Sequence, residues 1–284
     1  MTDKIQTVLV VGAGTMGHGI AQVSAMAGCD VRLFDVDRAL VEKGIAKLTA
    51  NLDKGVAKGK VTAEAKDEAL ARISAATDLA EASAGIDLAV EAVPEKLDLK
   101  AAVLRTIHES SPEHAILGSN TSSLSLTALA ARSGRPERTI GLHFFNPVHI
   151  MRLLEIVVAE QTSDDALARC RAYAEAIGKT SIVVNDSPGF ATSRLGLVIG
   201  LEAMRMLETG VASAEDIDKA MELGYAHPMG PLKLTDLVGL DVRLMIAEHL
   251  HAEVGEQFRP PAILRKMVRA GKLGKKTGEG FYKW

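Results

Sequence analysis

Residues 5–35 read IQTVLVVGAGTMGHGIAQVSAMAGCDVRLFD. The run from Ile5 to Val11 is apolar and rich in β-branched residues, which is typical of a strand buried on both faces. Three glycines follow with the spacing G-x-G-x-x-G, and the pattern then predicts a helix over 16–27 and a second strand ending at Asp35. A strand, a glycine turn, a helix and a strand with an acidic end together indicate a Rossmann-type α/β dinucleotide-binding domain.

The three glycines of this turn have separate roles. Gly12 permits the tight turn, Gly14 lets a pyrophosphate approach the backbone, and Gly17 lets the helix pack against the strand. The N–H groups at the helix N-terminus attract phosphates, so Thr15 and Met16 join the glycines as expected cofactor-binding residues. A glycine turn between strand and helix also occurs without a ligand. Its place here, after a strand and about 20 residues before an acidic strand end, favours a bound dinucleotide.

Asp35 decides which dinucleotide is expected. Its carboxylate can accept hydrogen bonds from the hydroxyls of the adenosine ribose, and its charge would repel an added 2′-phosphate. The sequence therefore predicts NAD as the cofactor. Two arginines close by, Arg32 and Arg38, keep NADP as the alternative.

The whole chain has the composition of a soluble globular protein. Its 284 residues suggest about two domains, and a net charge of −3 without a basic stripe does not indicate nucleic-acid binding. Cys29 and Cys170 give no disulfide framework or metal-ligand spacing, so buried reduced thiols are expected. Signal-peptide features are missing, and the apolar runs are too short to cross a bilayer. These features predict a cytoplasmic protein with neither membrane nor nucleic-acid partners.

Apolar periodicity divides the chain into two domains. The pattern predicts helices over 37–58, 62–72, 95–109 and 163–177, and strands over 86–93, 115–119, 138–145, 153–158 and 180–184. After a linker at 185–189 only helices are predicted, over 190–209, 213–223, 232–254 and 260–270. We therefore expect an NAD-binding α/β domain over 1–186 and a smaller all-α domain over 187–284. The C-terminal helices carry more apolar positions than one small core needs, which suggests a dimer interface.

The predicted helical hairpin at 37–72 is an insertion that a plain dinucleotide-binding domain lacks, and it is rich in lysine. The lysines are Lys43, Lys47, Lys54, Lys58 and Lys60. Such residues usually form a solvated helix face. The alternative is an electropositive arm for an anionic part of a substrate.

Polar residues at strand ends point to a site, since ligands of open α/β sheets bind at the carboxyl ends of the strands. Ser119 closes one predicted strand, and His143 and Glu155 lie in the next two. A lone buried histidine is usually structural. Here a tight turn at Asn146-Pro147 joins the two strands, so Glu155 can lie beside the imidazole, fix its tautomer and raise its proton affinity. Such a pair would serve as a general acid/base near neutral pH.

Six segments carry a resemblance to a known family. They are GAGTMGHGIA (12–21), VEAVPEKLDLK (90–100), ILGSNTSSLS (116–125), IGLHFFNPVHIMRLLEIV (140–157), VVNDSPGF (183–190) and GYAHPMGPLKLTDLVGLD (224–241). Together they resemble the short-chain L-3-hydroxyacyl-CoA dehydrogenases, which include bacterial 3-hydroxybutyryl-CoA dehydrogenases. The match covers essentially the whole chain at the family's spacing, and SNTSS followed by HFFNP is its most specific part.

The resemblance implies roles for residues in and beside the expected catalytic centre. His143 would be the acid/base at the C3 oxygen of the substrate, with Glu155 as its orienting partner. Ser119 would hydrogen-bond the substrate near the nicotinamide, and Asn120 would lie beside it as a cofactor contact. Asn146 of HFFNP counts among the expected substrate contacts.

The resemblance also implies the binding partners. Glu95 and Lys100 match positions that contact or order the cofactor. Lys58 matches a lysine that meets the phosphates of coenzyme A, which favours the electropositive-arm interpretation of the hairpin. A CoA-thioester substrate and a homodimer formed through the C-terminal helices are expected, as in the family.

The chain departs from the family pattern at Ser193, where the family usually has asparagine four residues after the glycine of PGF. Serine reaches less far, so Ser193 is an expected catalytic-site residue whose effect on substrate positioning is open. His149 and Arg152 also look more polar than a short acyl pocket requires. They either belong to a solvated loop or indicate a polar acyl chain.

Together these features predict an NAD-dependent interconversion of a short-chain (S)-3-hydroxyacyl-CoA and its 3-ketoacyl-CoA. In the oxidation, His143 takes the hydroxyl proton while C3 passes a hydride to the nicotinamide. One alternative is a sister dehydrogenase acting on a free hydroxy acid such as gulonate or carnitine. Another is a catalytically silent dinucleotide-binding protein, against which the presence of Ser119, His143 and Glu155 together argues.

Overall fold

The computed structural model describes residues 4–284, which divide into two compact units. The first unit ends at Ser187, and the second runs from Pro188 to Trp284. This division lies one residue from the boundary predicted after Asp186. Each unit encloses its own cluster of buried apolar side chains.

The first unit is built on one sheet, which has eight strands among the described residues in the order β3-β2-β1-β4-β5-β6-β7-β8. The strands are β1 (Thr7–Val11), β2 (Asp30–Phe34), β3 (Ile73–Ala76), β4 (Leu88–Glu91), β5 (Ile116–Ser119), β6 (Thr139–Phe144), β7 (Leu153–Val158) and β8 (Thr180–Asn185). Neighbouring strands pair in parallel except β6 and β7, which are antiparallel. The order 3-2-1-4-5-6 is that of a doubly wound dinucleotide-binding sheet, and it confirms the predicted Rossmann-type fold.

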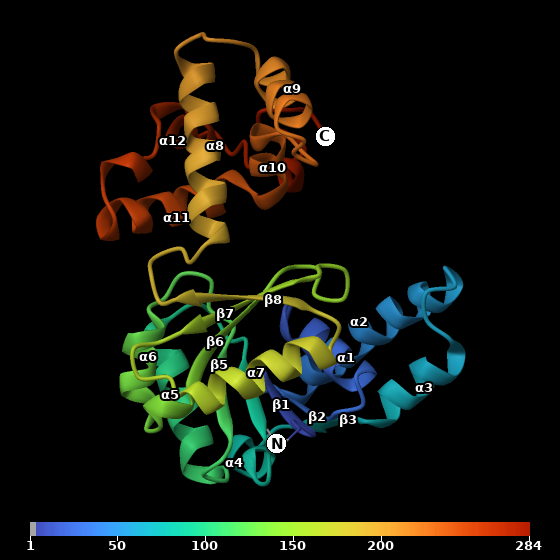
Figure 1. The fold of residues 1–284 in the computed structure, drawn as a ribbon. Coiled ribbons are helices and arrows are strands. Elements are labelled where there is room, and N and C mark those ends of the chain that lie inside the picture. The colour runs from blue at the N-terminus through green and yellow to red at the C-terminus, as the bar shows by residue number, and fades with distance from the viewer. Residues whose placement is uncertain (1–3) are drawn as a thin grey trace. The chain divides into compact units, whose positions relative to one another are not determined.

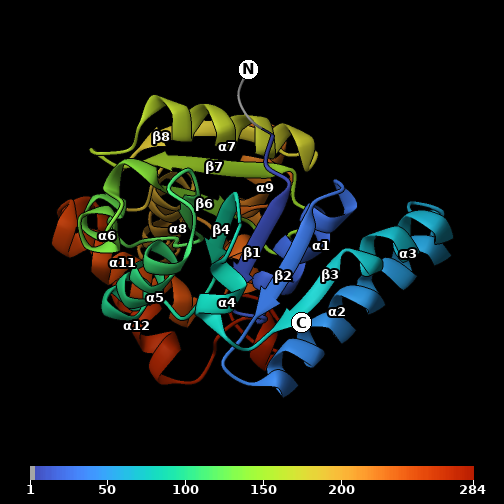
Figure 2. The same ribbon diagram turned by 90° about the horizontal axis from the view of Figure 1, so that it is seen from below.

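Helices cover both faces of the sheet. They are α1 (Gly17–Met26), α2 (Arg38–Ala57), α3 (Ala63–Ala71), α4 (Leu79–Ser83), α5 (Leu97–Ser110), α6 (Leu126–Ser133) and α7 (Asp164–Ala176), with a 3-10 turn at Pro136–Arg138. Figure 2 shows α1 and α7 on one side of the sheet and α4, α5 and α6 on the other. Because both faces are covered, the central strands are buried along their whole length and read as continuous apolar runs.

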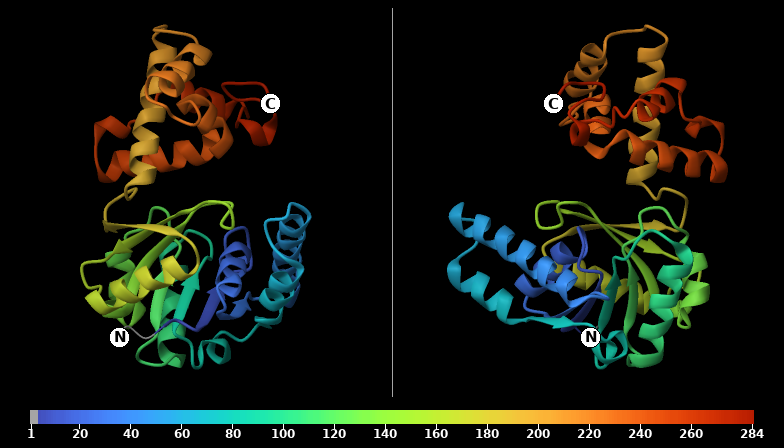
Figure 3. Two further views of the ribbon diagram at one scale, coloured as in Figure 1. Left: turned by 45° about the vertical axis from the view of Figure 1, so that its right-hand side comes forward. Right: turned by 180° about the vertical axis from the view of Figure 1, so that it is seen from behind.

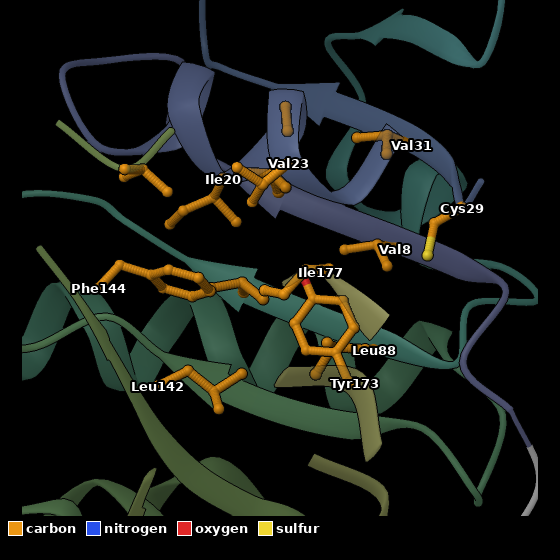
Figure 4. Packing of buried hydrophobic residues seen from close by; sticks show 14 of the residues in the cluster. Val8, Ile20, Val23, Cys29, Val31, Leu88, Leu142, Phe144, Tyr173 and Ile177 are labelled. Atoms are coloured by element: carbon orange, nitrogen blue, oxygen red, sulfur yellow. The ribbon is translucent and has the colours of Figure 1, made fainter. Parts of the chain in front are cut away.

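The core on the α1 side joins residues that are far apart in the sequence. Figure 4 shows Ile20 and Val23 of α1, Leu142 and Phe144 of β6, and Tyr173 of α7 gathered in this cluster. All five side chains are buried. This packing holds the glycine turn that precedes α1 against the strands that carry the candidate site.

Helices α2 and α3 form the predicted hairpin, which extends away from the sheet (Figures 1 and 3). Each helix begins at a capping side chain: Asp37 accepts from the backbone N–H of Ala39 at 2.8 Å, and Thr62 accepts from that of Ala65 at 3.1 Å. The buried residues of α2 recur at helical spacing, as Val41, Gly44, Leu48 and Leu52. The lysines of α2 therefore lie on its outer faces.

The second unit is helical, as predicted. Its helices are α8 (Thr192–Glu208), α9 (Ala214–Gly224), α10 (Pro231–Val238), α11 (Leu240–Glu253) and α12 (Ala262–Arg269), with 3-10 turns at Glu256–Phe258 and Lys275–Thr277. The single helix predicted over 232–254 is wrong. Gly239 has a φ of 105°, which no helical residue adopts, and it ends α10 and starts α11 in a new direction.

Candidate active site

His143 and Glu155 face each other across the antiparallel pair β6 and β7, where they are register partners. The Nδ1 atom of His143 lies 2.7 Å from Oε2 of Glu155. Glu155 is completely buried, and His143 is 7% exposed. With Nδ1 bound to a carboxylate, the neutral imidazole carries its hydrogen on Nδ1 and its lone pair on Nε2, which is the form that a general base needs. The contact that the sequence indicated is present.

The glycine turn between β1 and α1 has the geometry that a pyrophosphate requires. A Cβ atom on Gly17 would lie 1.7 Å from the carbonyl oxygen of Gly12, so the helix can start here only with glycine. Gly12 has a φ of 100°, and its own Cβ would lie 2.9 Å from the carbonyl oxygen of Ala92. A Cβ on Gly14 would meet no atom within 4 Å. The backbone at Gly14 is therefore open to a ligand, while the other two glycines are needed for packing.

Asp35 ties the end of β2 to this turn. Its Oδ2 accepts a hydrogen bond from the backbone N–H of Ala13 at 2.8 Å, and its Oδ1 accepts from that of Val36 at 2.8 Å. Each carboxylate oxygen has a further lone pair for a ribose hydroxyl. The two nearby arginines have other partners: Arg32 donates to the carbonyl oxygen of Ala82, and Arg38 pairs with Glu42 at 3.1 Å. These contacts support the choice of NAD.

Asn120 joins the end of β5 to the end of β6. Its backbone N–H donates to the carbonyl oxygen of Glu91 at 2.9 Å, and its Oδ1 accepts from the backbone N–H of Phe144 at 2.9 Å. Phe144 directly follows His143 in β6. Asn120 thus lies beside the histidine strand, and its expected role as a cofactor contact stays a prediction.

Ser119, at the end of β5, is completely buried, and its hydroxyl donates a hydrogen bond to Glu91. Glu91 was missed in the sequence, although it is the polar last residue of the apolar strand β4. Lys100 lies 3.0 Å from both carboxylate oxygens of Glu91 and 3.2 Å from Glu95. The structure therefore brings three predicted residues, Ser119, Glu95 and Lys100, into one network around an unpredicted carboxylate.

A groove of about 710 Å³ opens in the first unit beside the hairpin. Its walls include apolar side chains of α1 and of the loop before β7, among them Val23 and Met151. The basic side chains that line it are Lys54, Lys58, Lys60, Arg152 and Lys179, joined by His149. Among the described residues that line it there is no aspartate or glutamate. The groove is thus an amphipathic, positively charged site of the kind that an anionic ligand with an apolar portion fits.

His149 and Arg152 belong to this groove. Burial, together with the nearby basic side chains of His18, Lys179 and Lys54, holds the pKa of His149 below its usual value. Lys179 donates to the backbone carbonyl oxygens of Val148 and Met151, the latter at 2.6 Å, and so fixes the loop that carries both residues. Both side chains line the groove together with Lys54 and Lys58.

Two predicted residues stand apart from these contacts. Asn146 follows β6 in the loop before Pro147 and is exposed. Ser193 lies in the second unit, in the first turn of α8. The roles expected for both stay predictions.

The model of the NAD binding domain of 3-hydroxyacyl-CoA dehydrogenases matches residues 7–187, and the model of the C-terminal domain of the same proteins matches residues 189–284. The chain belongs to the 3-hydroxyacyl-CoA dehydrogenase family. The dehydrogenase is 44% identical over 280 residues to a probable 3-hydroxybutyryl-CoA dehydrogenase of Bacillus subtilis, covering 98% of this chain and 97% of the relative. It is 41% identical over 289 residues to the mitochondrial hydroxyacyl-coenzyme A dehydrogenase of Sus scrofa, covering 99% and 91%.

Solved structures agree with this assignment. The (S)-3-hydroxybutyryl-CoA dehydrogenase PaaH1 from Ralstonia eutropha superposes on the dehydrogenase with a TM-score of 0.95 at 44% identity, covering 99% of each chain. FadB2 of M. tuberculosis gives a TM-score of 0.94 at 42% identity, covering 99% of this chain and all of that one. The protein is therefore an NAD-dependent 3-hydroxyacyl-CoA dehydrogenase.

The residues of the turn fit this cofactor. The open backbone at Gly14 and the carboxylate of Asp35 would hold the pyrophosphate and the adenosine ribose of NAD. When bound, NAD supplies the nicotinamide that accepts or returns the hydride. No helix among residues 4–284 of the dehydrogenase combines the length and the apolar character needed to span a bilayer.

Proposed function

We propose that the dehydrogenase interconverts (S)-3-hydroxybutyryl-CoA and acetoacetyl-CoA, with His143 as the acid/base. The observation that carries the acid/base role is the 2.7 Å contact between His143 and the buried carboxylate of Glu155. The short acyl chain is supported by the full-length relatives that are named 3-hydroxybutyryl-CoA dehydrogenases.

In the oxidation, Nε2 of His143 would take the proton of the C3 hydroxyl. Bound NAD would supply the nicotinamide that accepts the hydride from C3, so that the alcohol carbon becomes a ketone. The imidazolium that forms keeps its Nδ1 hydrogen on Glu155, whose negative charge stabilises it. In the reduction the same imidazolium returns the proton to the C3 oxygen.

The basic groove is the proposed site for the nucleotide end of coenzyme A. Its lysines and Arg152 would neutralise the phosphates, and its apolar wall offers a surface for the adenine or the pantetheine chain. Lys58, at the end of the hairpin helix α2, is one of these lysines. This arrangement supports the interpretation of the hairpin as an electropositive arm.

We expect Lys58→Ala to raise KM for acetoacetyl-CoA about five-fold, which corresponds to about 1 kcal/mol for an exposed charged contact. The rise should fade as the salt concentration increases, because an exposed lysine–phosphate contact is screened. Steady-state kinetics at low and high salt measure both effects. Lys47→Ala is the matched control, because Lys47 is exposed on the same helix but does not line the groove. Equal effects of the two substitutions would contradict the proposed site.

The proposed chain length is tested by NADH oxidation with acetoacetyl-CoA, a six-carbon 3-ketoacyl-CoA and a long-chain 3-ketoacyl-CoA. We expect kcat/KM to be highest for acetoacetyl-CoA and to fall as the chain lengthens. A maximum at the long-chain thioester would refute the short-chain assignment and leave the acid/base role of His143 intact. The same panel, run on Ser193→Asn, examines the proposed part of Ser193 in positioning the substrate.

We also propose that the dehydrogenase forms a homodimer through its second unit. Several large apolar side chains of that unit are exposed, including Leu195 at 63%, Met245 at 59% and Leu237 at 46%. Apolar side chains of this size are normally covered when they cluster, and a second copy of the chain would cover them.

The cytoplasm is the proposed location. Cys29 and Cys170 are both buried and unpaired as free thiols. Free thiols of this kind suit a reducing compartment.

A further inference from the structure

A buried ion pair lies beneath the two loops that follow β4 and β5. Glu91 is completely buried and Lys100 is 1% exposed, and the ammonium of Lys100 lies 3.0 Å from each carboxylate oxygen of Glu91. The same ammonium donates to the carbonyl oxygen of Val93 at 3.2 Å. Burying such a pair is costly, and apolar residues of similar volume would often be at least as stable. Stability alone therefore gives little reason for a charged pair at this place.

The ion pair reaches both loops through carboxylates. Glu95, in the loop after β4, lies 3.2 Å from Lys100 through one oxygen. Its other oxygen accepts hydrogen bonds from the hydroxyl of Thr121 at 2.5 Å and the backbone N–H of Ser122 at 2.9 Å. Burial alone would raise the pKa of Glu95, but the charge of Lys100 and these hydrogen bonds lower it overall, so Glu95 stays ionised at neutral pH. One ammonium thus links the loop after β4 to the turn over 119–123.

Glu91 contacts the same turn through the hydroxyl of Ser119. The hydroxyl of Ser119 donates its only hydrogen to Glu91, and the oxygen of that hydroxyl accepts from the backbone N–H of Thr121 at 3.3 Å. The hydroxyl is therefore held in a single orientation with its oxygen as an acceptor. Burial raises the pKa of Glu91 overall, and the charge of Lys100 and the hydrogen bond from Ser119 offset only part of that rise.

The turn that this network fixes lies beside the histidine strand. Asn120, between Ser119 and Thr121, donates to the carbonyl oxygen of Glu91 at 2.9 Å and accepts from the backbone N–H of Phe144 at 2.9 Å. A displacement of Ser119 would therefore also shift Asn120 and its hydrogen bond to Phe144, which follows His143.

We propose that Glu91, held by Lys100, is a positioning residue that acts through Ser119 to fix the 119–123 turn for the reaction. The inference rests on the proposed role of Ser119 in the site. In this role Glu91 would contact neither the substrate nor the reacting atoms. The Ser119 hydroxyl would keep one orientation, because it donates its hydrogen to Glu91.

A double-mutant cycle tests this proposal, with Glu91→Gln, Ser119→Ala and the combined variant. Glutamine keeps the shape but removes the charge that holds Lys100 and the Ser119 hydrogen. We expect each single variant to lower kcat at least about ten-fold, and the combined variant to be no worse than the poorer single one, because residues that act as one unit are not additive. The dissociation constant for NAD, measured by calorimetry, should rise by a smaller factor than kcat falls in Glu91→Gln, because Gly14 and Asp35 lie in other segments of the chain.

Two further variants separate positioning from folding. Glu91→Asp keeps the carboxylate and should have a kcat between those of the native protein and Glu91→Gln, which also serves if the glutamine variant does not fold. Ser24→Ala is the matched control, because Ser24 makes an equally buried hydroxyl contact, 2.6 Å to the hydroxyl of Tyr173, away from the site. We expect it to lower the melting temperature and leave kcat unchanged.

The outcomes distinguish this inference from the proposed function. Losses that multiply in the combined variant, or a native kcat in folded Glu91→Gln, would overturn the positioning role of Glu91 alone. A native kcat in Ser119→Ala would remove the proposed role of Ser119 and this inference with it. A kcat for Glu91→Asp no higher than that for Glu91→Gln would also contradict it, because the carboxylate would then be irrelevant.

Discussion

Replacing His143 with alanine will lower kcat for acetoacetyl-CoA reduction roughly 10²- to 10⁴-fold, the range expected when a general acid/base is removed. The reason is geometric: Nδ1 is bound to Glu155 at 2.7 Å, so the imidazole is held as a proton carrier with Nε2 as its working atom. The dissociation constant for NAD should be nearly unchanged, since the glycine turn belongs to other elements. Stopped-flow or steady-state assays of NADH oxidation, together with calorimetry of NAD binding, give both values.

Glu155→Gln removes the negative charge beside His143 and leaves the histidine in place. Glutamine can still bond to Nδ1 but does not stabilise the imidazolium, so kcat should fall by less than in His143→Ala and more than KM changes. A native kcat in folded His143→Ala would contradict the acid/base assignment directly. A loss of NAD affinity equal to the loss in kcat would show that the substitution had damaged the whole unit.

Gly17→Ala should abolish NAD binding and destabilise the first unit. An added Cβ would lie 1.7 Å from the carbonyl oxygen of Gly12, and a contact with backbone cannot be relieved by turning a side chain. Either the turn or α1 must move, at a cost of about 3 kcal/mol or more. Thermal unfolding and calorimetry of NAD binding measure the two effects.

Gly14→Ala is the matched substitution with a different expected result. Its Cβ would meet no protein atom within 4 Å, so the melting temperature should stay within about 1 °C of the native value. The methyl group would occupy the space where the pyrophosphate approaches, and the dissociation constant for NAD should rise at least about ten-fold, or about 1.4 kcal/mol. Native affinity in Gly14→Ala would place the dinucleotide elsewhere.

Local patterns predicted the parts of the fold that depend on neighbouring residues. The glycine turn, the long hairpin helix α2 with its buried stripe, and the strand β7 all follow from spacing along the chain. The break at Gly239 was missed because glycine is tolerated within helices, and only its φ of 105° decides the matter. Strand β3 was missed because Ile-Ser-Ala-Ala is short and has little strand preference; its pairing with β2 makes it a strand.

The site was predictable to the extent that it depends on adjacent strands. His143 and Glu155 meet because β6 and β7 are consecutive strands that pair antiparallel, although the loop between them, residues 145–152, is longer than the predicted tight turn. Glu91 meets Lys100 of helix α5, 9 residues away, and Ser119 of strand β5, 28 residues away. No sequence pattern predicts that these three side chains come together. Spacing alone left the hairpin lysines between a solvated face and an electropositive arm. The groove adds Arg152 and Lys179 to Lys58, which supports the arm.

The central claim is tested most directly by NADH oxidation with two substrates, acetoacetyl-CoA and free acetoacetate, assayed on the same preparation of the native protein. The proposed roles of the groove and of the His143–Glu155 pair predict a CoA thioester that is reduced at C3. We therefore expect kcat/KM for acetoacetyl-CoA to exceed that for the free acid by at least about 100-fold, or about 2.7 kcal/mol. Equal or better turnover of the free acid, or NAD binding without turnover of either compound, would contradict it.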